Sequence, residues 1–138
     1  MWDYEHSVET TATPGAIWRL WADVENWADW NAEIEKIEID GPFAPGTRIT
    51  MTPPGDDPVE LTLAEVREDA LFVDEARFGD LLLRTSHRID ALGPELTRVT
   101  YRMEISGAGS DQAGPEIGPA ITADWPDTMA ALAKLAAR

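Results

Sequence analysis

The chain has 138 residues, of which 43% are hydrophobic and 27% charged, a composition typical of one folded domain spanning residues 1–138. Its 26 acidic and 11 basic residues give a net charge of −15, which disfavours nucleic acids and anionic membranes as partners. The chain has no cysteine, which excludes disulfides and thiolate chemistry. No signal peptide and no apolar run of the ~20 residues that span a bilayer is recognisable, so we expect a cytoplasmic protein without stable membrane insertion.

The first predicted element is a half-buried strand over residues 4–11. Apolar and weakly polar side chains alternate there with mainly acidic ones, which is the period of a strand with one solvated face. The face expected to point inward carries Tyr4, His6, Val8 and Thr10.

The next stretch concentrates tryptophan, with four of the six tryptophans between residues 18 and 30. Thr13 can cap a helix and Pro14 suits its first turn. Trp18 and Trp21 recur at helical spacing, and a second short helix is predicted to follow. The elements around this stretch must enclose something large and apolar, which is either an ordinary core or a ligand pocket.

Six further strands are predicted from alternating segments separated by turn signals. Short turns rich in Gly, Pro and Asp connect them, and the last five form an antiparallel meander. Because Ile34 is out of phase with Ile37 and Ile39, a bulge or late strand start is expected near Glu35. The predicted strands cover residues 32–39, 47–52, 59–66, 71–78, 81–91 and 96–106.

The C-terminal segment is predicted to be a loop followed by a helix. The glycine-rich residues 107–115 indicate the loop, and the helix is expected to begin near Pro119. Pro126 should kink this helix or start a fresh turn behind Asp124. Its buried stripe is predicted to be Ile121, Trp125, Met129, Leu132 and Ala136.

The pattern Ala12-x-Pro14-x-x-x-Trp18-x-x-x-x-Asp23-Val24-x-x-Trp27-x-x-Trp30-Asn31 resembles the opening of the START-like (SRPBCC) superfamily, in its bacterial polyketide cyclase/dehydrase-type branch. The resemblance implies an α+β helix-grip fold, in which a seven-stranded curved antiparallel sheet wraps around a long C-terminal helix and two short helices follow the first strand. It also implies that an apolar molecule such as a lipid, hormone or polyketide binds between helix and sheet. Some members are catalysts and many are not.

Strand phase places a few polar side chains on the inward face. In the strand 81–91, His87 shares that face with Leu83 and Thr85, while Arg84 and Arg88 are expected to face solvent. His6 and Tyr101 are predicted to point inward from their own strands. Each of these polar groups can be hydrogen-bonded within a packed core, can anchor a ligand, or can act as a general acid or base.

Two phases are possible for the strand 71–78. If Glu75 and Arg77 pointed inward, two charges would enter the interior. Unpaired buried charge is costly, so Phe72, Ala76 and Phe78 are expected to point inward instead.

We hypothesise that the chain binds a small hydrophobic, ring-containing molecule between the sheet and the C-terminal helix. The mouth of this cavity is expected near residues 107–114 and the Phe78–Asp80 turn. No metal or cofactor is expected, because the histidines and acids lack ligand spacing and no glycine-rich phosphate loop is present. The predicted ligand-binding residues are His6, His87, Tyr101, Met103, Trp125 and Met129.

Two alternatives remain open from the sequence. The first is a cyclase or dehydratase acting on a polyketide-like substrate, with His87 as acid or base and Tyr101 stabilising an enolate. The second is an interaction module whose core is filled, in which the tryptophans only pack. The sequence leaves the oligomeric state undecided.

Overall fold

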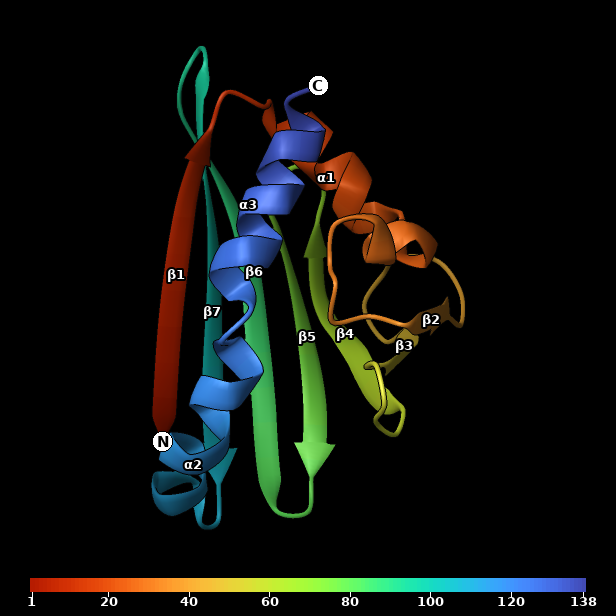
Figure 1. Cartoon of the computed structure of the whole chain (residues 1–138), viewed down its shortest axis with the longest axis vertical. Helices are drawn as coiled ribbons and strands as arrows, with labels where there is room; N and C mark the ends of the chain where they lie inside the picture. The colour runs from red at the N-terminus through yellow and green to blue at the C-terminus, as the bar shows by residue number, and fades with distance from the viewer.

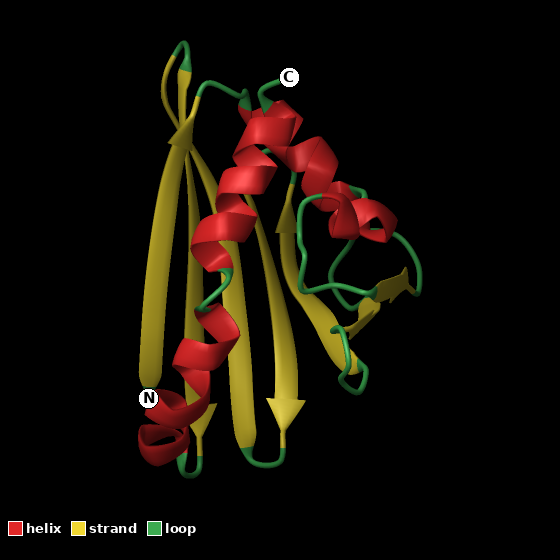
Figure 2. Cartoon of the chain, viewed as in Figure 1, coloured by secondary structure: helices red, strands yellow, loops and turns green.

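The structure, a computed structural model, describes residues 1–138 as one curved antiparallel sheet with helices on a single face (Figures 1 and 2). The strand order is β1-β7-β6-β5-β4-β3-β2, so the first strand lies at one edge of the sheet, next to the last strand. The strands are β1 (Trp2–Thr10), β2 (Lys36–Ile39), β3 (Arg48–Thr52), β4 (Val59–Arg67), β5 (Leu71–Phe78), β6 (Leu81–Gly93) and β7 (Leu96–Gly107). The helices are α1 (Pro14–Ala22), the short 3-10 helix η1 (Val24–Asp29), α2 (Ser110–Thr122) and α3 (Trp125–Ala136).

This arrangement confirms the predicted α+β helix-grip fold. The two short helices follow β1, and the C-terminal helices run along the concave face of the sheet (Figure 1). Helix α1 begins as expected, because the Thr13 hydroxyl accepts a hydrogen bond from the Ala16 amide at 3.2 Å and Pro14 occupies the first turn. None of the helices is long and apolar enough to cross a membrane.

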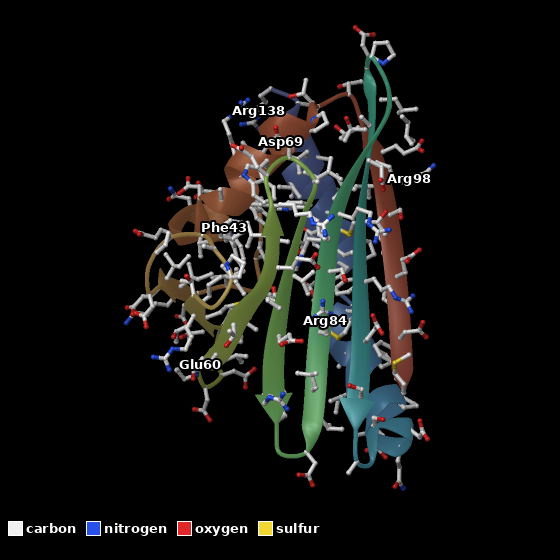
Figure 3. The ribbon with its side chains drawn as sticks, turned by 180° about the vertical axis from the view of Figure 1, so that it is seen from behind. Phe43, Glu60, Asp69, Arg84, Arg98 and Arg138 are labelled. Carbon is white, nitrogen blue, oxygen red and sulfur yellow. The ribbon has the colours of Figure 1, made fainter.

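The predicted strand phase is also confirmed. Phe72 on β5 pairs with His87 on β6, and Tyr101 on β7 lies between His87 and His6 of β1, so the four side chains form one row across the sheet. The neighbouring Arg88 is exposed. Figure 3, drawn from behind, shows Arg84 on the outer face of β6.

The second strand starts late, as its hydrophobic pattern indicated. Strand β2 begins only at Lys36, and Ile34 lies buried in the connection before it. Ile34 therefore contributes to the core from the connection, and the strand begins only after it.

The predicted loop over residues 107–115 is wrong beyond Gly109, because helix α2 begins at Ser110 and not near Pro119. The glycines serve close packing. A Cβ on Gly114 would lie 2.2 Å from the Trp2 Cβ, and one on Gly118 would lie 2.5 Å from the Trp2 ring. Spaced four apart, the two glycines give α2 a smooth face on which Trp2 of β1 rests.

The C-terminal helix is divided where Pro126 indicated. Helix α2 ends at Thr122, and α3 begins at Trp125 with Pro126 in its first turn. The Thr128 hydroxyl donates to the Asp124 carboxylate at 3.0 Å, which holds the start of α3. The two helices thus follow one another along the sheet with a break between them, visible in Figure 2.

One group of fully buried side chains lies where α1 meets the C-terminal half of α3 (Figure 1). The side chains there are completely enclosed between these helices and the sheet. They include Ile17, Trp21, Val99, Met129 and Leu132. We call this region the closed end of the interior.

Candidate functional site

Away from the closed end, the helices and the sheet separate around a cavity of about 650 Å³. This volume lies within the ~300–1,000 Å³ of typical ligand sites. Strands β4 to β7 form its floor, while the segment from Trp27 to Ile34 and the junction of α2 with α3 form its walls. We call this region the cavity end.

The exposed lining residues mark where the cavity opens to solvent. They lie before β2, in the β3–β4 turn, at the end of β5 and around the junction of α2 with α3: Glu33, Asp56, Phe78, Ala120, Ile121, Ala123 and Asp127. The prediction that the Phe78–Asp80 turn lies near the mouth is therefore correct for Phe78. The prediction for residues 107–114 is wrong, because the first residues of α2 pack on β1 and none of them lines the cavity.

Four of the six predicted ligand-binding residues line the cavity: His87, Tyr101, Met103 and Trp125. The other two, His6 and Met129, do not. His6 has the predicted inward phase, but α2 and α3 lie over β1 and separate it from the cavity. Met129 lies one helical turn beyond Trp125, which carries it into the closed end, where it is fully buried.

His87 stands at the centre of an aromatic row. Its ring stacks on Phe72 with 3.8 Å between centroids and meets the edge of Tyr101 at 4.5 Å. His87 Nδ1 lies 3.2 Å from the Phe72 carbonyl oxygen, and since a carbonyl only accepts, Nδ1 carries the proton. Burial lowers the pKa of His87 to about 3, against the smaller opposing effect of that hydrogen bond. The ring is therefore neutral near pH ~7, and Nε2 is left as an acceptor.

Tyr101 belongs both to the core and to the cavity. Its hydroxyl oxygen accepts a hydrogen bond from Trp21 Nε1 at 3.2 Å, and its ring packs edge-on against Trp125 at 5.7 Å. Burial raises the pKa of Tyr101, so the hydroxyl keeps its proton as a donor.

The residue that sequence reasoning missed is Asp74. It points into the cavity from β5 between Phe72 and Ala76, and its Oδ2 lies 4.0 Å from His87 Nε2. Burial first and the nearby charge of Glu75 second raise the pKa of Asp74 to about 7. The signal was present in the sequence, because the phase that turns Phe72 and Ala76 inward also turns Asp74 inward.

The sequence model described as "Polyketide cyclase / dehydrase and lipid transport" matches residues 1–138. The chain belongs to this family. The match confirms the START-like resemblance on its polyketide cyclase/dehydrase-type branch. No curated protein is similar in sequence to the chain.

Solved structures similar to this family member share its fold at low sequence identity. A Thermobifida fusca protein solved by solution NMR has a TM-score of 0.81 at 19% identity, covering 99% of this chain and 93% of its own. Norcoclaurine synthase from Thalictrum flavum, in complex with dopamine and hydroxybenzaldehyde, has a TM-score of 0.77 at 19% identity, covering 97% and 85%. The di-domain ARO/CYC BexL from the BE-7585A biosynthetic pathway has a TM-score of 0.74 at 18% identity, covering 97% and 46%. These likenesses show the helix-grip fold.

The tryptophans that carried the family resemblance are divided between the two ends of the interior. Trp18 packs edge-on against Trp21 at 6.2 Å, outside the cavity. Trp27 and Trp30 line the cavity, together with Trp125 from α3. The family motif thus contributes both to closed core and to cavity wall.

Proposed function

We propose that the protein binds a small hydrophobic, ring-containing molecule in the cavity between the sheet and the C-terminal helices. The observation that carries this proposal is the cavity itself, because 16 of its 26 lining residues are hydrophobic. Trp27, Trp30 and Trp125 surround it with large, flat side chains that favour contact with a ring. Thr85, His87 and Tyr101 add a few polar groups that can orient such a molecule.

The comparisons support a ligand of this class. The family description includes polyketide cyclases and lipid transport, which both concern largely apolar molecules. Norcoclaurine synthase, which has the same fold, is described in complex with two small aromatic molecules, dopamine and hydroxybenzaldehyde.

The proposal is tested by titrating the protein with hydrophobic fluorophores, flavonoids and fatty acids while recording tryptophan emission. Since three tryptophans line the cavity, a bound ring should quench or shift the emission, and members of the panel should compete. Ala76→Phe fills the cavity from the floor and should weaken binding at least about tenfold. Ala131→Phe adds the same side chain to an exposed site on α3 and is the matched control.

Two results would contradict the proposal. If no member of the panel binds, or if Ala76→Phe and Ala131→Phe bind the panel equally well, the cavity is not a binding site. The interaction module with a filled core would then describe the protein better.

A cyclase or dehydratase is the second candidate, favoured by the position of Asp74. A carboxyl group with a pKa of about 7 in an apolar cavity suits proton transfer near neutral pH, whereas His87, with its pKa lowered to about 3, cannot serve as an acid there. In this enzyme Asp74 would move the proton, and Tyr101 would donate a hydrogen bond to the developing enolate. Turnover of an aryl polyketide mimic that is lost in Asp74→Asn but kept in Asp90→Asn would establish catalysis.

A further inference from the structure

The cavity is lined by carboxylates without any basic counterpart. Five acidic residues and no Lys or Arg contribute to its wall. Four of the acids, Glu33, Asp56, Asp124 and Asp127, are partly or fully exposed, so water solvates them at least in part. Asp74 differs from these four, because its side chain is only 10% exposed and lies on the floor of the cavity.

Asp74 has no partner within the protein. No donor lies within hydrogen-bond distance of its carboxylate, and the nearest ring nitrogen, His87 Nε2, stands 4.0 Å away without a proton to give. Carboxylates on the outer face of the sheet are instead paired, as Glu75 is with Arg84 at 2.9 Å and Glu9 with Arg98 at 3.1 Å. Figure 3 shows both arginines, Arg84 and Arg98, on that outer face, away from the cavity.

The ring nitrogen nearest to Asp74 is an acceptor as well. Nε2 of His87 is an acceptor, and the proton on Nδ1 is already used by the Phe72 carbonyl. A buried carboxylate that faces a second acceptor is unfavourable until a donor or a cation reaches both. A metal ion fits poorly, because no three acidic or histidine side chains converge to hold one.

We propose that the molecule bound in this cavity carries a positively charged amine, and that Asp74 forms the ion pair with it. This proposal rests on the binding function proposed above and names the class of its ligand: a hydrophobic ring or chain bearing an ammonium group. The ammonium donates to the Asp74 carboxylate and to His87 Nε2, and the apolar part lies among the tryptophans. The exposed acids at the mouth attract the same charge.

Binding of such an amine is coupled to pH. In the empty protein the Asp74 carboxyl, with its pKa raised to about 7, is largely protonated in mildly acidic solution, so a cation must displace that proton. Affinity for the amine should therefore rise as pH increases through about 7 and then level off while the amine stays protonated, as a Lys ammonium does. The titratable and charged groups around the site are Glu75, Arg84, His87, Tyr101, Asp124 and Asp127.

The test uses three probes that share one ring system and differ only in charge: naphthylethylamine, naphthylethanol and naphthylacetate. At about pH 8 the amine should bind at least about tenfold more tightly than the alcohol, and the carboxylate most weakly. At about pH 5.5 the preference for the amine over the alcohol should fall about tenfold or more, while the affinity for the alcohol stays constant. This comparison needs only the unaltered protein.

The variant Asp74→Asn should abolish the preference for the amine without weakening the alcohol. Asp90→Asn is the matched control, because it removes the same charge from an exposed site on β6 that does not line the cavity. It should leave the preference within about twofold of the original protein, since a distant surface charge is screened by salt.

The results distinguish a failure of the ion pair from a failure of the binding function. If the amine and the alcohol bind equally at about pH 8, or if Asp74→Asn keeps the preference, the ion pair is overturned while hydrophobic binding stands. If none of the three probes binds, the proposed binding function fails and the ion pair fails with it.

Discussion

The two ends of the interior use the same kinds of residue to different effect. At the closed end, Trp21 is fully buried among Trp18, Phe72 and Tyr101, and its indole N–H is hydrogen-bonded. At the cavity end, Trp125 is nearly as buried, at 7% exposure, yet it faces a cavity of about 650 Å³. Low exposure therefore does not distinguish a core tryptophan from one in a cavity wall. The identity of its neighbours does.

The difference follows from which elements cover the sheet. Helix α1 packs against α3 at the closed end and completes the layer of side chains there. At the cavity end the helix layer is interrupted between Thr122 and Trp125, and the wall opposite is formed largely by the segment around η1 and by the turn before β4. Irregular segments and a helix break leave a space that a continuous helix would fill.

The largest expected effect compares one tryptophan from each end. Trp21→Ala should lower the free energy of unfolding by about 3–5 kcal/mol, because it leaves a cavity in a close-packed region and removes the donor to Tyr101. Trp125→Ala should cost less than half as much, because part of the Trp125 surface already faces empty space. Denaturant midpoints and slopes measure both losses. Equal losses would mean that the cavity end is as tightly packed as the closed end.

The second effect is the pH dependence that the cavity imposes on stability. Asp74 has its pKa raised from 3.8 to about 7, so its stabilising contribution is complete below about pH 3.8 and is lost as pH rises to about 7. Asp74→Asn should therefore match the original protein near pH ~4 and exceed it by up to about 4 kcal/mol above pH ~7. Unfolding curves recorded across this range, with Asp90→Asn as control, measure the difference.

His87 shifts stability in the opposite direction. Its pKa is lowered from 6.5 to about 3, so its stabilising contribution is present above about pH 6.5 and is lost as pH falls. Between about pH 4 and pH 6.5 the folded chain holds a proton on Asp74, whereas the unfolded chain holds one on His87. The two residues therefore change the free energy of unfolding with pH in opposite directions, and their effects cancel. His87→Leu should remove the effect of His87 and leave that of Asp74, so that the free energy of unfolding rises as pH falls through that range. A stability profile of His87→Leu parallel to that of the original protein would refute it.

The sequence predicted the closed end better than the cavity end, for a physical reason. Hydrophobic spacing fixes which face of an element is buried, and it correctly placed Trp21, His87, Tyr101 and Trp125 inside. It did not separate the lining residue Trp125 from the core residue Met129, because both belong to one helical stripe and differ only in what lies opposite. That difference depends on where α2 ends.

Two errors outside the closed end involved residue types that have more than one structural use. Gly114 was predicted to lie in a loop, but Gly114 and Gly118 are the contact surface of α2 for Trp2, which no local pattern distinguishes. Asp74 was overlooked because charged residues are expected outside, although the strand phase placed it inside. The cytoplasmic location and the roles of the lining residues stay predictions.

The smallest expected effect concerns ligand orientation. His87→Leu should weaken ligands with a polar ring substituent more than plain fatty acids, because only the former lose a hydrogen bond to Nε2, worth about 0.5–1.5 kcal/mol. Paired titrations of the variant and the original protein measure the difference. Equal weakening of both ligand types would show that His87 contributes shape alone.

The central claim is that ligands enter the cavity end and leave the closed end untouched. The six indole N–H signals in a nitrogen-15 NMR spectrum test it directly, because three of the tryptophans line the cavity and the other three do not. On addition of naphthylethylamine, or of any ligand found by the fluorescence panel, the signals of Trp27, Trp30 and Trp125 should shift in proportion to occupancy. Those of Trp2 and Trp18 should stay in place. Shifts centred on Trp2 or Trp18, with the three lining tryptophans unmoved, would contradict the account.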